Sequence, residues 1–125
     1  MDNIAFTNEQ VSLFSEILEQ DILNIKILFY IAQCEQNKTK VHIKTLSENI
    51  KIPRPVGQKN GKGNIKSYIV EEVYIDRKRA ERVVDRLVYA SLITFEIQKP
   101  HKYIRLTDRG AQIAIYIQKK MQAKN

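Results

Sequence analysis

Five basic side chains fall within ten residues of this sequence, between positions 77 and 86. Like charges at this spacing repel one another on a helix unless an anion such as phosphate neutralises them. Arginine also carries paired N–H donors that match the O6 and N7 acceptors of guanine in the DNA major groove. This cluster therefore predicts contact with nucleic acid. Its members are Arg77, Lys78, Arg79, Arg82 and Arg86.

The residues around this cluster predict the helix that positions it. Asp76 is a favourable N-cap, and apolar side chains then repeat at helical spacing, giving a helix over residues 76–90. The apolar positions Ala80, Val83 and Leu87 share one face, so most of the basic side chains lie on the other. The helix N-terminus adds free N–H groups for phosphate. We interpret 76–90 as a recognition helix, against the alternative of a solvated charged surface.

Two short β-prone segments follow the helix. ITFEIQ and YIRLT flank the polar tip KPHK, which predicts a β-hairpin over residues 93–106. A hairpin after a recognition helix is the wing of a winged helix, and its tip reaches the DNA backbone or minor groove. The tip residues expected to do so are Lys99, His101 and Lys102.

Residues 53–74 are the least ordinary part of the chain. They begin with PRP and continue with GQKNGKGN, whose prolines and glycines exclude a helix, so we predict an inserted loop. Its basic residues suggest an arm that contacts DNA phosphates. The β-prone stretch 68–74 leaves a second interpretation open, a β-arm used in dimerisation. The basic residues are Arg54, Lys59, Lys62 and Lys66.

The remaining residues predict a mainly α-helical domain with a small β-hairpin, an α+β winged helix-turn-helix that spans residues 1–125 as one unit. Thr7 and Gln10 form a capping box, and Asp21 is placed to cap a second helix. A short strand over 40–43, a short helix over 44–50 and a last helix capped by Thr107 complete the order. Apolar positions on the terminal helices predict a homodimer interface made by Val11, Phe14, Leu18, Ile113 and Ile117.

The charge distribution supports a polyanionic partner. Residues 1–50 hold four Lys/Arg against seven Asp/Glu, whereas residues 51–125 hold seventeen against seven. Such asymmetry places a positive surface at one end of a small protein. A single cysteine, no apolar run of membrane-spanning length and no signal peptide pattern predict a cytoplasmic protein without a membrane partner.

The run IDRKRAERVVDRLVYASLI and the later LTDRG resemble the MarR family of winged-helix regulators. The first matches the family's recognition-helix segment, and the second matches the L-T-x-x-G that closes its wing. The similarity covers 41–52 and 75–117. It implies a homodimer that binds a pseudo-palindromic operator in double-stranded DNA, one recognition helix per half-site. Two features depart from the family: Ser91 replaces a glycine, and residues 53–74 replace a short turn.

Other chemistries find little support. GQKNGKG has Gly63 where a P-loop has Ser or Thr, and His42, His101 and Cys34 are too scattered for a metal site. Acidic residues form no acid–base pair, so neither an enzyme nor a cofactor is expected. The sequence predicts a transcriptional regulator, acting as a dimeric repressor, with any small-molecule effector unknown. A plasmid or phage replication or partition factor and a winged-helix protein–protein module are the alternatives.

Overall fold

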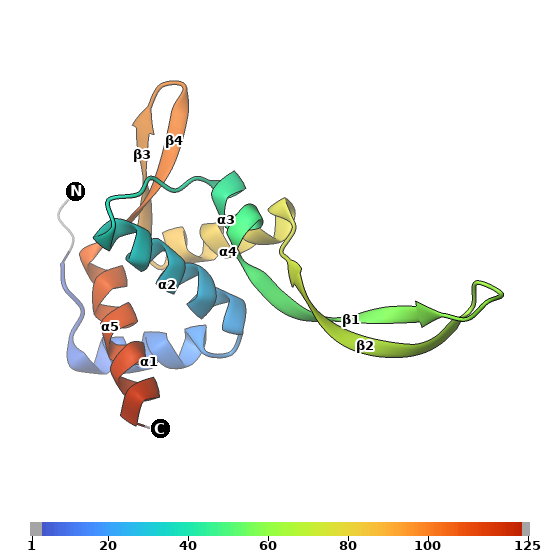
Figure 1. The fold of residues 1–125 in the computed structure, drawn as a ribbon. Helices are drawn as coiled ribbons and strands as arrows, with labels where there is room; N and C mark the ends of the chain where they lie inside the picture. The colour runs from blue at the N-terminus through green and yellow to red at the C-terminus, as the bar shows by residue number, and fades with distance from the viewer. Residues whose placement is uncertain (1–3, 124–125) are drawn as a thin grey trace.

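A computed structural model describes residues 4–123 of the chain. In this range five helices pack together, and two separate antiparallel hairpins leave the helical body in different directions (Figure 1). The elements in chain order are α1 (Asn8–Leu18), α2 (Ile22–Gln36), α3 (Ile43–Asn49), β1 (Lys51–Lys59), β2 (Ile65–Tyr74), α4 (Arg77–Tyr89), β3 (Ile93–Gln98), β4 (His101–Leu106) and α5 (Asp108–Ala123). The α+β class with a small wing-like hairpin is as predicted.

Four helices begin at the predicted caps, including α5, where Thr107 Oγ1 accepts the Gly110 N–H at 3.0 Å. Thr7 and Gln10 form the capping box of α1, in which the Gln10 backbone N–H donates to Thr7 Oγ1 at 3.2 Å. Asp21 accepts from the Leu23 N–H at 3.0 Å, so residues 8–36 form two helices rather than one. Asp76 accepts from the Arg79 N–H at 2.8 Å at the start of α4. These side chains satisfy N–H groups that the first helical turn leaves without partners.

The core lies around α2, whose Leu23, Ile27, Leu28 and Ile31 are fully buried. The predicted strand over 40–43 is reduced to one bridge, in which the Ile104 N–H donates to the Val41 carbonyl at 2.7 Å. The prediction of a strand there was wrong, because α3 begins at Ile43 and leaves only a single residue able to pair. This bridge still fixes β4, and with it the β3–β4 hairpin, to the helical body.

The residues predicted to form a dimer interface on the terminal helices are largely covered within the single chain. Val11, Leu18, Ile113 and Ile117 are all buried within the single chain, at most 7% exposed, because α1 and α5 pack against each other and the core. Phe14 is half-buried and stacks on Phe6 with ring centroids 4.7 Å apart. An apolar stripe at helical spacing shows that one face of a helix packs against other residues. Here the residues that pack on these faces belong to the same chain. Dimerisation itself stays a prediction.

The segment 53–74 is a hairpin and not a loop. β1 pairs with β2 from Lys51↔Tyr74 to Gln58↔Ser67, and a bulge follows before Lys59↔Ile65. The hairpin extends away from the helices (Figure 1), and we call β1, β2 and their connecting turn the arm. Pro53 and Pro55 lie inside β1, although prolines at these positions led us to predict a loop. The predicted loop was wrong because proline is tolerated on an edge strand where its missing N–H would face outward.

Ser91 ends α4 in a left-handed conformation with φ of 63°. The Ser91 N–H donates to Val88 O at 2.9 Å and the Leu92 N–H to Leu87 O at 2.9 Å, the two bonds of a Schellman motif. Glycine is favoured at this position because a Cβ makes positive φ unfavourable. We expect Ser91→Gly to raise the free energy of unfolding by about 1 kcal/mol, measured by urea denaturation. An unchanged or lower value would contradict the strain inferred at this residue.

The described helices include none with the combination of length and apolar character that crossing a bilayer requires.

Candidate nucleic-acid interface

The solvent face of α4 carries three free cations. Ala80, Val83 and Leu87 are fully buried beneath the helix, which fixes its rotation about its own axis. The side chains of Lys78, Arg79 and Arg82 are exposed and make no hydrogen bond or ion pair with any described residue. A rigid helix therefore presents three unneutralised cations to solvent.

The other two basic residues of α4 have partners within the chain. Arg77 Nε lies 3.3 Å from Glu81 Oε1, one helical turn away. Arg86 donates to Asn24 Oδ1 at 3.2 Å and lies 3.5 Å from Asp21 Oδ2, at the start of α2. Arg86 thus ties α4 to α2. Of the five residues in the predicted cluster, three therefore have unpaired side chains among the described residues. The other two, Arg77 and Arg86, form ion pairs with acidic side chains of the same chain.

Arg54 of the arm joins this surface. A hollow of about 290 Å³ lies where the arm meets the beginning of α4, and Arg54 and Arg79 both line it. Two arginines from different segments thus line one hollow, together with the acidic Asp76, and arginine is a residue type that binds phosphate. The remaining lining residues are Ile52, Pro53, Pro55, Val73, Tyr74, Ile75 and Asp76.

The other predicted arm residues lie elsewhere. Lys59, Lys62 and Lys66 are exposed at the far end of the arm, and Figure 1 shows that end well away from α4 of the same chain. The tip is an ordered turn, because Asn60 Oδ1 accepts the N–H groups of Lys62 at 2.9 Å and Asn64 at 3.1 Å. The structure does not bring these three lysines together with the α4 cations of their own chain.

The β3–β4 hairpin places its basic tip in solvent. Lys99, His101 and Lys102 are exposed, with Lys102 Nζ 3.9 Å from the centroid of the Phe95 ring. Arg105 fixes the base of this hairpin to α2, since it donates to Glu35 and, at 2.7 Å, to Glu96 Oε2. The hydrogen bond from Arg105 lowers the pKa of Glu35 below its ordinary value, although burial acts in the opposite direction. The hairpin is therefore braced as a wing would need to be.

Tyr89 lies on the solvent side of α4 and is not among the predicted site residues. It is 91% exposed, the highest value among the exposed large apolar and aromatic side chains of the described residues. Its ring can contact a base or sugar, and its hydroxyl can donate to a phosphate. The signal that could have identified it is an aromatic residue on the charged face of a helix, because charged and polar residues typically occupy the solvent face of a surface helix.

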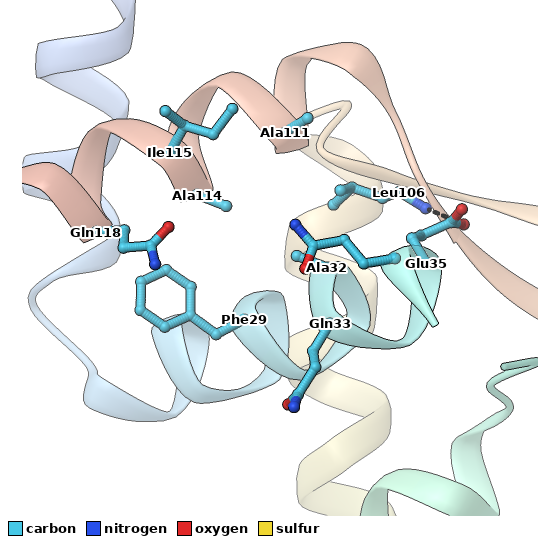
Figure 2. A pocket seen from close by; sticks show the side chains of 10 residues that line it. Phe29, Ala32, Gln33, Glu35, Leu106, Ala111, Ala114, Ile115 and Gln118 are labelled. Carbon is cyan, nitrogen blue, oxygen red and sulfur yellow. Dashed lines mark hydrogen bonds between the residues drawn. The ribbon is translucent and has the colours of Figure 1, made fainter. Parts of the chain in front are cut away.

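A pocket of about 470 Å³ lies between α2, β4 and α5 (Figure 2). Its floor is apolar, with Phe29, Ala114 and Ile115, and Figure 2 shows Glu35 at one end bonded to the Leu106 N–H. Because Glu35 is already paired with Arg105, the pocket offers amide groups and no free charge. The remaining lining residues are Ala32, Gln33, Gln36, Leu106, Ala111 and Gln118.

No group of three His, Cys, Asp or Glu side chains within residues 4–123 is placed to hold a metal ion. Comparisons of the chain with protein-family models, with curated proteins and with solved structures find no match.

Proposed function

We propose that this chain is a sequence-specific DNA-binding protein that acts as a dimeric transcriptional regulator. The observation that carries the proposal is the solvent face of α4, where the side chains of Lys78, Arg79 and Arg82 are exposed and form no hydrogen bond or ion pair within residues 4–123. α3 packs against α4 as the first helix of a helix-turn-helix does. In this arrangement α4 lies in the major groove and the β3–β4 hairpin is the wing.

The dimensions and the charge both suit this arrangement. The major groove is about 12 Å wide and admits one α-helix, and the 13 residues of α4 span about 20 Å. Arg82 lies in the middle of the helix, where a side chain reaches base edges, whereas Arg54 and Arg79 lie at its beginning, where phosphates pass. Repression is the simplest consequence, because a protein bound at a promoter excludes polymerase. The resemblance of 75–117 to MarR-like regulators supports the same conclusion.

Selection of bound sequences from random duplex DNA tests the proposal. We expect enrichment of one pseudo-palindromic sequence, with affinity that falls steeply as salt rises. Sites within promoters would favour a regulator, and repeated sites at a replication origin would favour a replication or partition factor. Absence of salt-dependent binding to any duplex would contradict DNA binding and leave the protein–protein alternative.

Arg82→Ala is expected to weaken binding to the selected duplex by about 1–3 kcal/mol and to relax preference at one position of each half-site. The Arg82 side chain is exposed and forms no hydrogen bond or ion pair with the described residues, so its loss should leave folding unchanged. Fluorescence anisotropy on the selected duplex and its single-base variants measures both effects. Lys119→Ala, which removes an exposed charge from α5, is the control. Equal losses on all duplexes would place Arg82 on a phosphate and not on a base.

A further inference from the structure

We propose that β2 is the element through which two copies of this chain associate, by antiparallel pairing of β2 with β2 of a second copy about a two-fold axis at Ile69. The inference deepens the proposed function by naming the element that joins the two copies, and it is tested without DNA. It also replaces the terminal-helix interface, because four of its five predicted residues are buried in the single chain and the fifth, Phe14, is half-buried.

The arm lacks a core of its own. Along β2, Ile65, Tyr68, Val70 and Tyr74 are 55–73% exposed, and along β1 only Ile52 is buried. An isolated two-stranded hairpin is marginally stable in water, and three or more strands are ordinarily needed. A second hairpin beside the first would make a sheet of four strands. The arm therefore has the properties of an element that is completed by a partner.

The two edges of the arm differ. The Ile75 N–H donates to the Ile50 carbonyl at 3.0 Å, which identifies this pair as hydrogen-bonded. Since hydrogen-bonded pairs alternate along an antiparallel ladder, Arg54↔Glu71 and Val56↔Ile69 are of the same kind. The backbone groups of Pro53 and Pro55 consequently point to the outer edge of β1. Proline has no N–H, so that edge is poorly suited to accept another strand.

The outer edge of β2 is open. By the same alternation the N–H and C=O groups of Tyr68, Val70, Glu72 and Tyr74 point away from β1. None of these residues is proline, and all four side chains are exposed. An unblocked edge with aromatic and β-branched residues is a site for strand addition. The proline positions thus direct association to β2.

The charges of β2 are complementary to β2 itself. In the antiparallel register that places Ile69 opposite Ile69 of the second copy, Tyr68 faces Val70 and Lys66 faces Glu72, each pair occurring twice by symmetry. A register shifted by two residues places Tyr68 opposite Glu72 and loses the ion pairs. Aromatic–β-branched and opposite-charge pairs are the cross-strand combinations that stabilise sheets. This self-complementarity identifies a second copy as the occupant.

The same register predicts where the lysines at the far end of the arm would lie in the dimer. Continued to the end of the arm, it places residue 62 alongside residue 76 of the second copy, where that copy's α4 begins. Lys59 and Lys62 would then extend the basic surface of the partner's α4 and not that of their own. In this arrangement the arm would both join the two copies and contact DNA, so the two interpretations of the arm are compatible.

Exchange of the paired charges tests the register. We expect Lys66→Glu and Glu72→Lys each to weaken the dimer about tenfold, because two attractive pairs become two repulsive ones. The double variant should return to within about threefold of the parent, as it restores both pairs. Within one chain the two residues lie six positions apart on one strand, so the restoration can arise only between subunits. Analytical ultracentrifugation without DNA measures the dissociation constants, and circular dichroism confirms folding.

Disulfide formation tests the position of the axis. Facing residues of a non-hydrogen-bonded pair have Cα atoms about 4.5 Å apart, within the range that a disulfide spans. Ile69→Cys should therefore form a covalent dimer under mild oxidation. Val56→Cys is the matched control: it faces Ile69 within the hairpin but lies three strand spacings, about 14 Å, from its equivalent in the dimer. The parent, with its buried Cys34, controls for other cross-links.

Three results would overturn the proposal. The first is a parent protein that is monomeric at micromolar concentration. The second is a dimer that neither charge reversal weakens, which would place the interface elsewhere, such as the exposed Leu13, Ile17 and Ile115 of the terminal helices. The third is equal cross-linking of the Ile69→Cys and Val56→Cys variants. None of these results bears on whether α4 binds DNA.

Discussion

Gly110→Ala is expected to lower the free energy of unfolding by about 2–3 kcal/mol, although alanine in place of glycine within a helix ordinarily stabilises it by up to about 1 kcal/mol. Gly110 lies in the first turn of α5, against the residue that follows the end of α4. A Cβ added there would lie 2.0 Å from the Leu92 carbonyl oxygen and 2.8 Å from Leu106 Cδ1. The nearest obstacle is backbone, which cannot turn aside as a side chain can.

The backbone at this point is held from both sides. The Thr107 N–H donates to the Leu92 carbonyl at 3.1 Å, and Thr107 Oγ1 donates to the Ser91 carbonyl at 2.6 Å. Thr107 Oγ1 also accepts the Gly110 N–H at 3.0 Å. Any shift of α5 that relieved the clash would break these bonds. The LTDRG segment thus joins the end of α4 to the start of α5, and through this joint the wing is fixed relative to α4.

Gly61→Ala is the matched control. Gly61 lies in the turn of the arm, and a Cβ there would meet no atom within 4 Å. Its unfolding free energy should stay within about 0.5 kcal/mol of the parent. Urea denaturation followed by circular dichroism measures both variants. A Gly110→Ala protein as stable as the parent would contradict the close approach of α5 to Leu92.

The elements with local signals were predictable from the sequence. Thr7, Asp21 and Asp76 each cap a helix at the expected residue, because a cap depends on atoms only two or three positions away. The β3–β4 hairpin was likewise indicated by two β-prone segments around a short polar tip. In these cases the residues that decide the structure are neighbours in the chain.

The arm was not predictable in the same way. Whether Pro53 and Pro55 exclude a strand depends on which way their backbone groups point, and that orientation is set by the register with β2. Register is a non-local property, determined here by pairing across a turn of several residues. The sequence identified a β-prone stretch at 68–74 but held no local signal for the matching strand in 51–59.

The candidate site was predictable in composition but not in detail. The periodicity of α4 correctly separated its buried and exposed faces. It could not show that Arg86 is held by Asn24, 62 positions away, or that Glu35 on α2 anchors Arg105 of the wing. Equally, an apolar stripe on α1 and α5 does not indicate whether its covering surface belongs to the same chain or to another.

Replacing the three free cations of α4 together is expected to produce the largest loss of function. We predict that the Lys78→Ala, Arg79→Ala, Arg82→Ala variant binds its selected duplex at least about 100-fold more weakly at physiological salt. The helix holds five basic and two acidic residues, so the change reduces its net charge from +3 to zero. Folding should be retained, because these side chains form no hydrogen bond or ion pair with the part of the chain that the structure describes, and alanine favours the helix.

The salt dependence separates this effect from a general weakening. Each phosphate contact contributes about 0.9 to the slope of log affinity against log salt, so loss of the two contacts expected of Lys78 and Arg79 should reduce the slope by about 1.8, with Arg82 assigned to a base. Between 50 and 200 mM salt the parent should then lose about 12-fold more affinity than the variant does. Lys119→Ala on α5, a similarly exposed charge distant from α4, should leave the slope nearly unchanged. A triple variant with the parent's slope would show that the free face of α4 does not meet phosphates, and the basic residues of the wing and arm would then have to account for any binding.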